Sequence, residues 1–108
     1  MHPLMTSYTV TFPDFYDDLA AFEIESKGFL DGVIVEFADG RKVSLSFRDP
    51  WNVQLDHDVT GETPSGIRYL AIPNLVVVDV VSRAAILDSI DALVKDGSYF
   101  GALGASVS

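Results

Sequence analysis

The chain has 108 residues, a length typical of one domain, with sixteen acidic and seven basic residues and a net charge of −9. This balance argues against binding to nucleic-acid phosphates or anionic lipid, because both need clustered Lys and Arg. The chain has no cysteine, which excludes thiol catalysis, cysteine-ligated zinc and disulfides. We expect one domain over residues 1–108, ordered from about residue 6 to residue 100.

The beginning of the chain has no basic cluster, and no apolar run is long enough to span a bilayer. We therefore expect neither a signal peptide nor a membrane span, and a cytoplasmic protein.

The first predicted element is a strand over residues 8–12, which ends at Pro13. The next segment has two interpretations. A helix capped by Asp14 would place three apolar side chains on one face, namely Phe15, Leu19 and Phe22. A strand that starts near Ala21 fits the alternation of the following residues equally well.

Two further strands, residues 29–37 and 42–47, flank the turn sequence Asp39-Gly40. A two-residue turn would place Phe37 opposite Lys42 and mix apolar with polar side chains on one face. A turn longer by one residue places the apolar side chains on one face and the polar ones on the other. Its expected pairs are Val35–Val43, Val33–Leu45 and Glu36–Lys42. We expect this longer turn, with Gly40 in the left-handed conformation.

Asp49-Pro50 is typical of a helix cap followed by proline in the first turn. It predicts a short helix over residues 50–57 that buries Trp51 and Leu55. Residues 60–66 contain two glycines and a proline and predict a loop.

A second hairpin is predicted from residues 67–72 and 75–81, joined by Pro73-Asn74. Its expected pairs are Leu70–Val77 and Arg68–Asp79. The run Leu75-Val76-Val77-Val78 has no polar alternation, which is typical of a central strand covered on both faces.

The last predicted element is a helix over residues 83–95, capped by Ser82 and ended by Gly97. Its apolar residues recur at helical spacing: Ile86, Leu87, Ile90, Leu93 and Val94. Asp91 and Lys95 are one turn apart and predict an ion pair. We expect residues 101–108 to form a loose tail.

Together these elements predict an α+β fold in two layers: a mainly antiparallel sheet of about five strands with the C-terminal helix packed on one face. Three segments resemble small uncharacterised bacterial α/β proteins of unknown function. They are Phe37-Ala38-Asp39-Gly40-Arg41, Phe47-Arg48-Asp49-Pro50 and Pro73-Asn74-Leu75-Val76-Val77-Val78, closed by a helix and Tyr99-Phe100. The resemblance covers about residues 29–100 and implies only the α/β layout.

The densest polar cluster is Asp56-His57-Asp58. A metal site needs three or more converging ligands, and adjacent residues do not converge on a helix or a strand, so a solvated helix end is the favoured interpretation. Trp51 is the other candidate binding residue, as a surface anchor for a partner, although a lone Trp more often covers the core.

Two further patterns have a chemical interpretation. Pro13-Asp14 followed by Glu25-Ser26-Lys27 matches the loose pattern of metal-dependent nucleases, in which two carboxylates hold Mg²⁺ and a lysine helps to activate water. The carboxylates of Asp14, Asp17 and Asp18 are close enough in sequence to bind a cation, but such residues are more often caps and solvated surface. We therefore expect no metal and no cofactor.

The leading functional expectation is a small acidic, non-enzymatic interaction or assembly module. It would be either a homodimer or an inhibitor or immunity-type protein that covers a basic partner. The alternative is a small metal-dependent enzyme or metal binder that uses Asp56, His57, Asp58 or Glu25. A convergent pocket of carboxylates and His57 would favour the enzyme, and an apolar face rimmed by acids would favour the module.

Overall fold

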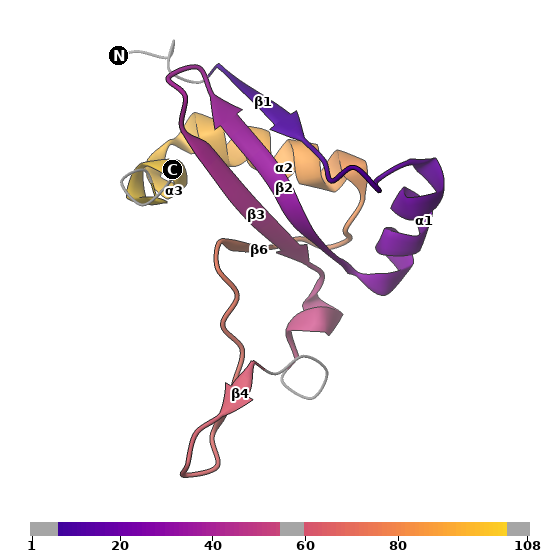
Figure 1. Cartoon of the computed structure of the whole chain (residues 1–108), viewed down its shortest axis with the longest axis vertical. Helices are drawn as coiled ribbons and strands as arrows, with labels where there is room; N and C mark the ends of the chain where they lie inside the picture. Colours follow the sequence, from indigo (N-terminus) through magenta and orange to yellow (C-terminus); the bar gives the residue numbers. More distant parts are fainter. Residues whose placement is uncertain (1–6, 55–59, 104–108) are drawn as a thin grey trace.

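The computed structural model describes residues 7–54 and 60–103 and places a four-stranded sheet against a long C-terminal helix (Figure 1). The elements in chain order are β1 (Tyr8–Thr11), α1 (Asp18–Lys27), β2 (Phe29–Phe37), β3 (Lys42–Arg48), the 3₁₀ turn η2 (Pro50–Val53), β4 (Gly61–Glu62), β5 (Arg68–Tyr69), β6 (Leu75–Val77), α2 (Arg83–Asp96) and α3 (Ser98–Leu103). The order in the main sheet is β1-β2-β3-β6, and β4 pairs with β5 in a separate two-stranded sheet. The expected α+β class is confirmed, with four strands in the main sheet.

The β2–β3 hairpin has the predicted register. Val35 lies opposite Val43, and the pairs Val33–Leu45 and Glu36–Lys42 follow. The backbone N–H of Phe37 donates to the carbonyl oxygen of Arg41 at 2.9 Å, which closes the three-residue turn. Gly40 has a φ of 96°, as expected for its place in this turn.

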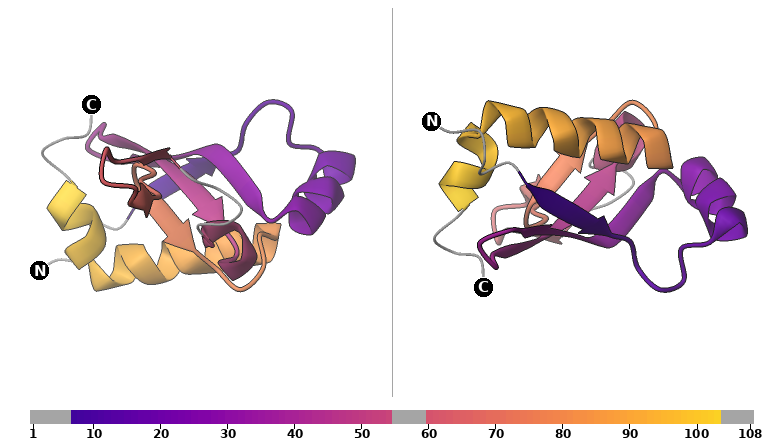
Figure 2. Two further views of the ribbon diagram at one scale, coloured as in Figure 1. Left: turned by 90° about the horizontal axis from the view of Figure 1, so that it is seen from below. Right: turned by 90° about the horizontal axis from the view of Figure 1, so that it is seen from above.

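The core lies between the sheet and α2, which runs along one face (Figure 2). The alternate residues of β2 and β3 that point to this face are fully buried, as are Ile86 and Ile90 of the helix. The Ser82 hydroxyl caps α2 by accepting from the backbone N–H of Ala85 at 3.1 Å, and Lys95 pairs with Asp91 at 2.9 Å. The predicted cap and ion pair are thus confirmed.

The predicted second hairpin is wrong. Residues 60–71 close on themselves instead, because the Thr60 hydroxyl bonds to the backbone N–H of Ala71 at 2.7 Å and the Thr63 hydroxyl accepts from the N–H of Ile67 at 3.0 Å. The β4–β5 hairpin therefore joins part of the predicted loop over residues 60–66 to the predicted strand over residues 67–72. Strand β6 returns to the sheet and pairs in parallel with β3, so that it forms an edge of the sheet and is not a central strand.

Residues 18–27 form a helix, which resolves the two interpretations of this segment. The cap is Asp17, whose side chain accepts from the N–H of Ala20 at 2.8 Å, and not Asp14. Ile24 is buried against the body, whereas Leu19 and Phe22 are 67% and 73% exposed. The helix is apolar on two opposite sides, and only one of them is covered by residues that the structure describes.

The Asp49 cap of the η2 turn is confirmed, since its side chain accepts from the N–H of Asn52 at 3.0 Å. The turn spans only four residues, and Asn52 contacts the body by donating to the carbonyl oxygen of Lys27 at 2.7 Å. Trp51 therefore points outward and is 59% exposed, contrary to its predicted burial. Leu55 lies outside the described residues.

The predicted start of a loose tail at residue 101 is wrong, because α3 continues to Leu103. Phe100 is buried and packs edge-on against Phe37, with 5.2 Å between ring centroids. This aromatic contact holds α3 against the end of the sheet.

Candidate functional site

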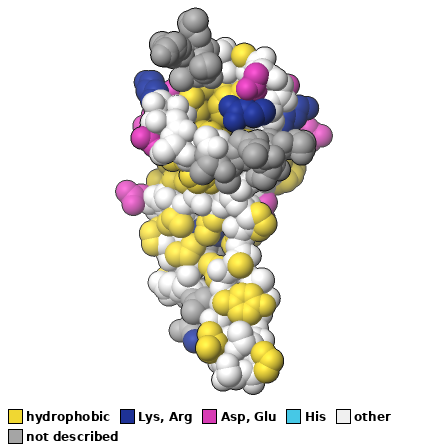
Figure 3. All heavy atoms as spheres, turned by 90° about the vertical axis from the view of Figure 1, so that its left-hand side faces the viewer, with side chains coloured by type: hydrophobic (Ala, Val, Ile, Leu, Met, Phe, Trp, Pro, Cys, Tyr) yellow, Lys and Arg dark blue, Asp and Glu magenta, His cyan; other side chains and the backbone are white. Residues whose placement is uncertain are grey.

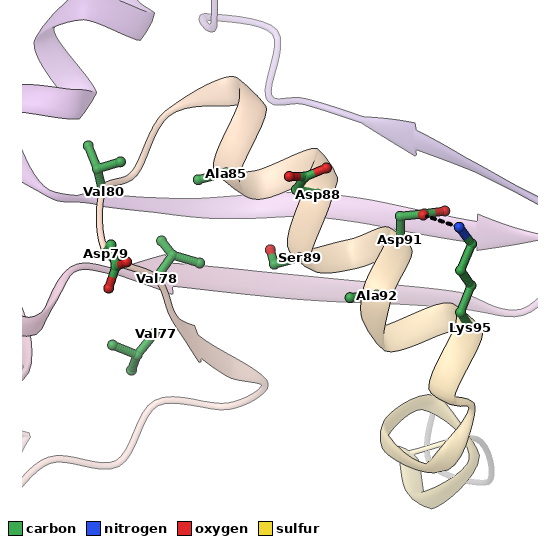
Figure 4. Close-up of a pocket in the computed structure, with 10 residues that line it drawn as sticks. All are labelled: Val77, Val78, Asp79, Val80, Ala85, Asp88, Ser89, Asp91, Ala92 and Lys95. Atoms are coloured by element: carbon green, nitrogen blue, oxygen red, sulfur yellow. Dashed lines mark ion pairs between the residues drawn. The ribbon is translucent and has the colours of Figure 1, made fainter.

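An open groove of about 750 Å³ lies between α2 and the segment that begins in β6. Figure 4 shows the side chains that line it, and these come from two stretches of chain. The strand side contributes Val77, Val78, Asp79 and Val80, and the helix side contributes Ala85, Asp88, Ser89, Asp91, Ala92 and Lys95.

Small side chains on α2 leave this groove open. Ala85, Ser89 and Ala92 are spaced four and three residues apart, so they lie along one side of the helix. Figure 4 shows that this side is turned toward the strand segment, where Val78 points at the helix. A groove with alanine and serine on one wall and valine on the other has room for larger apolar side chains.

Within residues 7–54 and 60–103, the strand wall of the groove is also an open edge of the sheet. The carbonyl oxygen of Asn74 accepts from Ser46 at 3.2 Å, and the N–H of Val78 donates to Arg48 at 2.9 Å, so these two residues direct their backbone groups toward β3. Alternate residues of a strand direct theirs to opposite sides. Leu75 and Val77 therefore direct their N–H and carbonyl groups outward, where another strand could pair with them.

Carboxylates form the rim of the groove. Asp79 and Asp88 are exposed, and Asp91 is half-buried. Lys95 donates to Asp91, and the Tyr8 hydroxyl also donates to it at 3.1 Å. These contacts lower the pKa of Asp91 below its ordinary range and keep it charged. Three carboxylates and one ammonium group give the rim a net charge of −2.

The residues predicted to form a binding site are only partly placed by the structure. Trp51 lies on η2, away from the groove lining, and its exposure is compatible with a surface anchor. Asp56, His57 and Asp58 lie outside the described residues, so their role stays a prediction.

The proposed metal patterns do not form a cluster in the part of the chain that the structure describes. Within residues 7–54 and 60–103, no group of three or more His, Asp or Glu side chains is placed to hold a metal ion. Asp17 serves as the cap of α1, and Asp14 precedes that helix, whereas Glu25 lies near its end.

Arg48 is the buried charged residue of the described core, and its contacts account for its position. Its guanidinium donates to Asp31 at 2.9 Å and to the carbonyl oxygen of Phe47 at 3.1 Å, and it lies 5.1 Å from the ring centre of Phe29. These contacts hold the bulge of β2 near Asp31 in place. We regard Arg48 as a structural residue.

The sequence interpretation missed the groove because it placed residues 75–81 in the centre of the sheet. The spacing of Ala85, Ser89 and Ala92 was visible in the sequence as a stripe of small residues on the last helix. Without the edge position of β6, this stripe carries no information about a binding surface.

No family model matches the chain, and neither a curated protein nor a solved structure matches it. The resemblance to small bacterial α/β proteins therefore stays a suggestion from the sequence. Among the described helices, none has the length and apolar character needed to cross a bilayer.

Proposed function

We propose that this chain is a non-enzymatic interaction module that binds an extended, basic segment of a protein partner. The observation that carries the proposal is an apolar groove with an acidic rim directly beside an open sheet edge. An apolar face rimmed by acids is the arrangement expected of an interaction module, whereas an enzyme would need a convergent pocket of carboxylates and His57. An inhibitor or immunity-type protein that covers a basic partner is one form that such a module takes.

The proposed mode of binding is strand addition. An extended peptide beside β6 would form backbone hydrogen bonds with the outward groups of Leu75 and Val77. Its alternate side chains would point to opposite faces, so that apolar ones enter the groove. Lys or Arg in the remaining positions would point to the opposite face and be favoured by the net charge of −9.

The net charge supports a basic partner. A chain at −9 attracts a cationic protein over a distance and repels an acidic one. The alternative function, a metal-dependent enzyme that uses His57, depends on a cluster outside the described residues, and no described contact favours it.

The test is a titration of the ¹⁵N-labelled protein with a short peptide that alternates lysine and valine. We expect amide shifts concentrated at residues 75–80 and along the groove side of α2. A matched peptide that alternates glutamate and valine should cause much smaller shifts. Equal shifts with both peptides, or shifts confined to other elements, would contradict the proposal.

A pair of variants on α2 provides the matched control. Ala92→Trp fills the groove and should weaken binding of the lysine–valine peptide about tenfold or more, which corresponds to about 1.4 kcal/mol. Ala84→Trp places the same ring at an exposed position of the same helix that does not line the groove. It should leave the affinity close to that of the unmodified chain.

A further inference from the structure

Helix α1 lies at one end of the sheet and is fixed to the body by one of its sides (Figure 2). Ile24 of this helix is buried, and the side chain of Asn52 donates to the carbonyl oxygen of Lys27 at 2.7 Å. The helix is capped at both ends, by Asp17 at its start and by the left-handed Gly28 at its end. These contacts hold α1 in one orientation, with its other side turned away from the body.

The outward side of α1 carries two large apolar side chains, Leu19 and Phe22, here called the stripe. They are three residues apart and therefore neighbours on the helix surface. Leu19 is 67% exposed and Phe22 is 73% exposed, so residues that the structure describes do not cover the stripe. Removing both side chains from water would favour association with a partner.

Three carboxylates flank the stripe in the pattern of a coiled-coil helix. With Leu19 and Phe22 at positions a and d of a heptad, Glu23 falls at position e, and Asp18 and Glu25 fall at position g. All three acidic side chains are exposed, and within residues 7–54 and 60–103 none of them forms an ion pair. Positions e and g lie beside the a/d seam, and their charge determines which helix can pair there.

We propose that α1 is a docking helix whose stripe packs against a helix of a protein partner with Lys or Arg beside its own apolar residues. Charge selects this occupant, because acidic e and g positions attract basic ones and repel acidic ones. A second copy of α1 is disfavoured, since pairing would bring the same carboxylates against each other. This inference is independent of the groove beside β6, which is proposed to bind an extended segment.

The apolar surface of the β4–β5 hairpin offers no such selection. Figure 3 shows hydrophobic side chains in the lower part of the molecule, with few charged groups among them. Ile67 in this hairpin is 62% exposed. A surface without a charge pattern favours no partner of particular chemistry, whereas the flanked stripe of α1 does.

The test is a titration of the ¹⁵N-labelled chain with a helical peptide of about three heptads, with leucine at a and d and lysine at e and g. The lysines also oppose pairing of the peptide with itself. We expect amide shifts concentrated at residues 18–26. A matched peptide with glutamate at e and g should cause much smaller shifts. Equal shifts with both peptides, shifts confined to other elements, or no shifts would overturn the proposal.

A pair of alanine variants tests the stripe itself. Phe22→Ala removes an exposed ring, so the core is unchanged, and it should weaken binding of the lysine peptide about tenfold. The control Ile67→Ala shortens an apolar side chain of similar exposure on the hairpin and should leave the affinity unchanged. Equal affinities of Phe22→Ala and the unmodified chain would contradict the proposal.

Charge reversal separates the local pattern from the net charge of the chain. The double variant Glu23→Lys, Glu25→Lys changes two exposed positions and leaves the chain acidic overall. It should bind the glutamate peptide at least as well as the lysine peptide. A persistent preference for the lysine peptide would mean that the net charge alone attracts it, and the proposal would be wrong.

Light scattering tests the other occupant, a second copy of this chain. We expect the mass of one chain, 11.7 kDa, for both the unmodified protein and Phe22→Ala. Twice this mass for the unmodified protein, with the mass of one chain for Phe22→Ala, would identify a second copy on the stripe and overturn the proposal.

Discussion

Gly40 lies in the turn between β2 and β3 with a φ of 96°, which residues with a side chain rarely adopt. A Cβ at this position would meet no atom within 4 Å, so alanine introduces backbone strain without a steric clash. We expect Gly40→Ala to lower the free energy of unfolding by about 1 kcal/mol or more. Urea denaturation monitored by circular dichroism measures this change.

Gly101 provides the matched control. A Cβ there also meets nothing within 4 Å, but the residue lies in α3 and has no positive φ. Alanine is the better helix former, so Gly101→Ala should leave stability unchanged or raise it slightly. If the two substitutions had the same effect, the left-handed turn would not be a requirement at Gly40.

At the scale of elements, the hydroxyl of Tyr8 joins β1 to α2 by donating to Asp91. Asp91 has a lowered pKa, chiefly because Lys95 donates to it and secondly because Tyr8 does. We expect Tyr8→Phe to raise the pKa of Asp91 part of the way to its ordinary value, and Lys95→Met to raise it further. A ¹³C-carboxyl NMR titration measures both. An unchanged pKa of Asp91 in Tyr8→Phe would contradict the assigned contact.

The sign of the pH dependence follows from these shifts. A carboxyl group with a lowered pKa in the folded state stabilises that state above its unfolded pKa, and this contribution disappears as the pH falls through the folded pKa. The pKa of Tyr8 is raised, first by burial and then by Asp91. Its contribution is present below the ordinary pKa of about 10 and is lost as the pH rises through the folded value. The β1–α2 link is therefore weakened at both ends of the pH range.

Elements that depend on neighbouring residues were predictable from the sequence. The β2–β3 register follows from alternation around a turn, and the start of α2 follows from Ser82 as its cap. The partner of β6 was not predictable in this way, because a parallel pair with β3 joins segments that are distant in the chain. Apolar periodicity indicated which face of a helix is hydrophobic, but not whether that face has a partner, and Leu19 and Phe22 show the difference.

For the candidate site, the types of residue were predictable from the sequence, but their arrangement in space was not. The acidic balance and the apolar run at Leu75–Val78 both contribute to the groove proposed as the binding site. Their association depends on α2 lying beside an edge strand, which no local pattern specifies. Trp51 was predicted to be buried and became an exposed residue because η2 is only one turn long.

At the scale of the whole molecule, the chain contains sixteen acidic residues but only seven basic ones. Within the described ranges, ion pairs join Asp39 to Arg41, Asp31 to Arg48 and Asp91 to Lys95. Even if every basic residue paired with one carboxylate, most of the carboxylates would keep their charge without a basic partner. Repulsion among the excess carboxylates therefore opposes the compact state, while the exposed ion pairs contribute little to it.

These two effects respond to salt in opposite directions, which makes their balance measurable. Salt screens repulsion beyond a Debye length of about 10 Å at 0.1 M, and it also weakens exposed ion pairs. Because the carboxylates are in large excess, we expect sodium chloride to raise the melting temperature at pH 7, with about 1 kcal/mol corresponding to roughly 4–8 °C. Near the isoelectric point of about 4.3 the net charge vanishes, and the same salt should have little effect. A melting temperature that falls with salt at pH 7 would mean that the ion pairs outweigh the repulsion. The measurement is made at low protein concentration, so that self-association does not contribute to the stability.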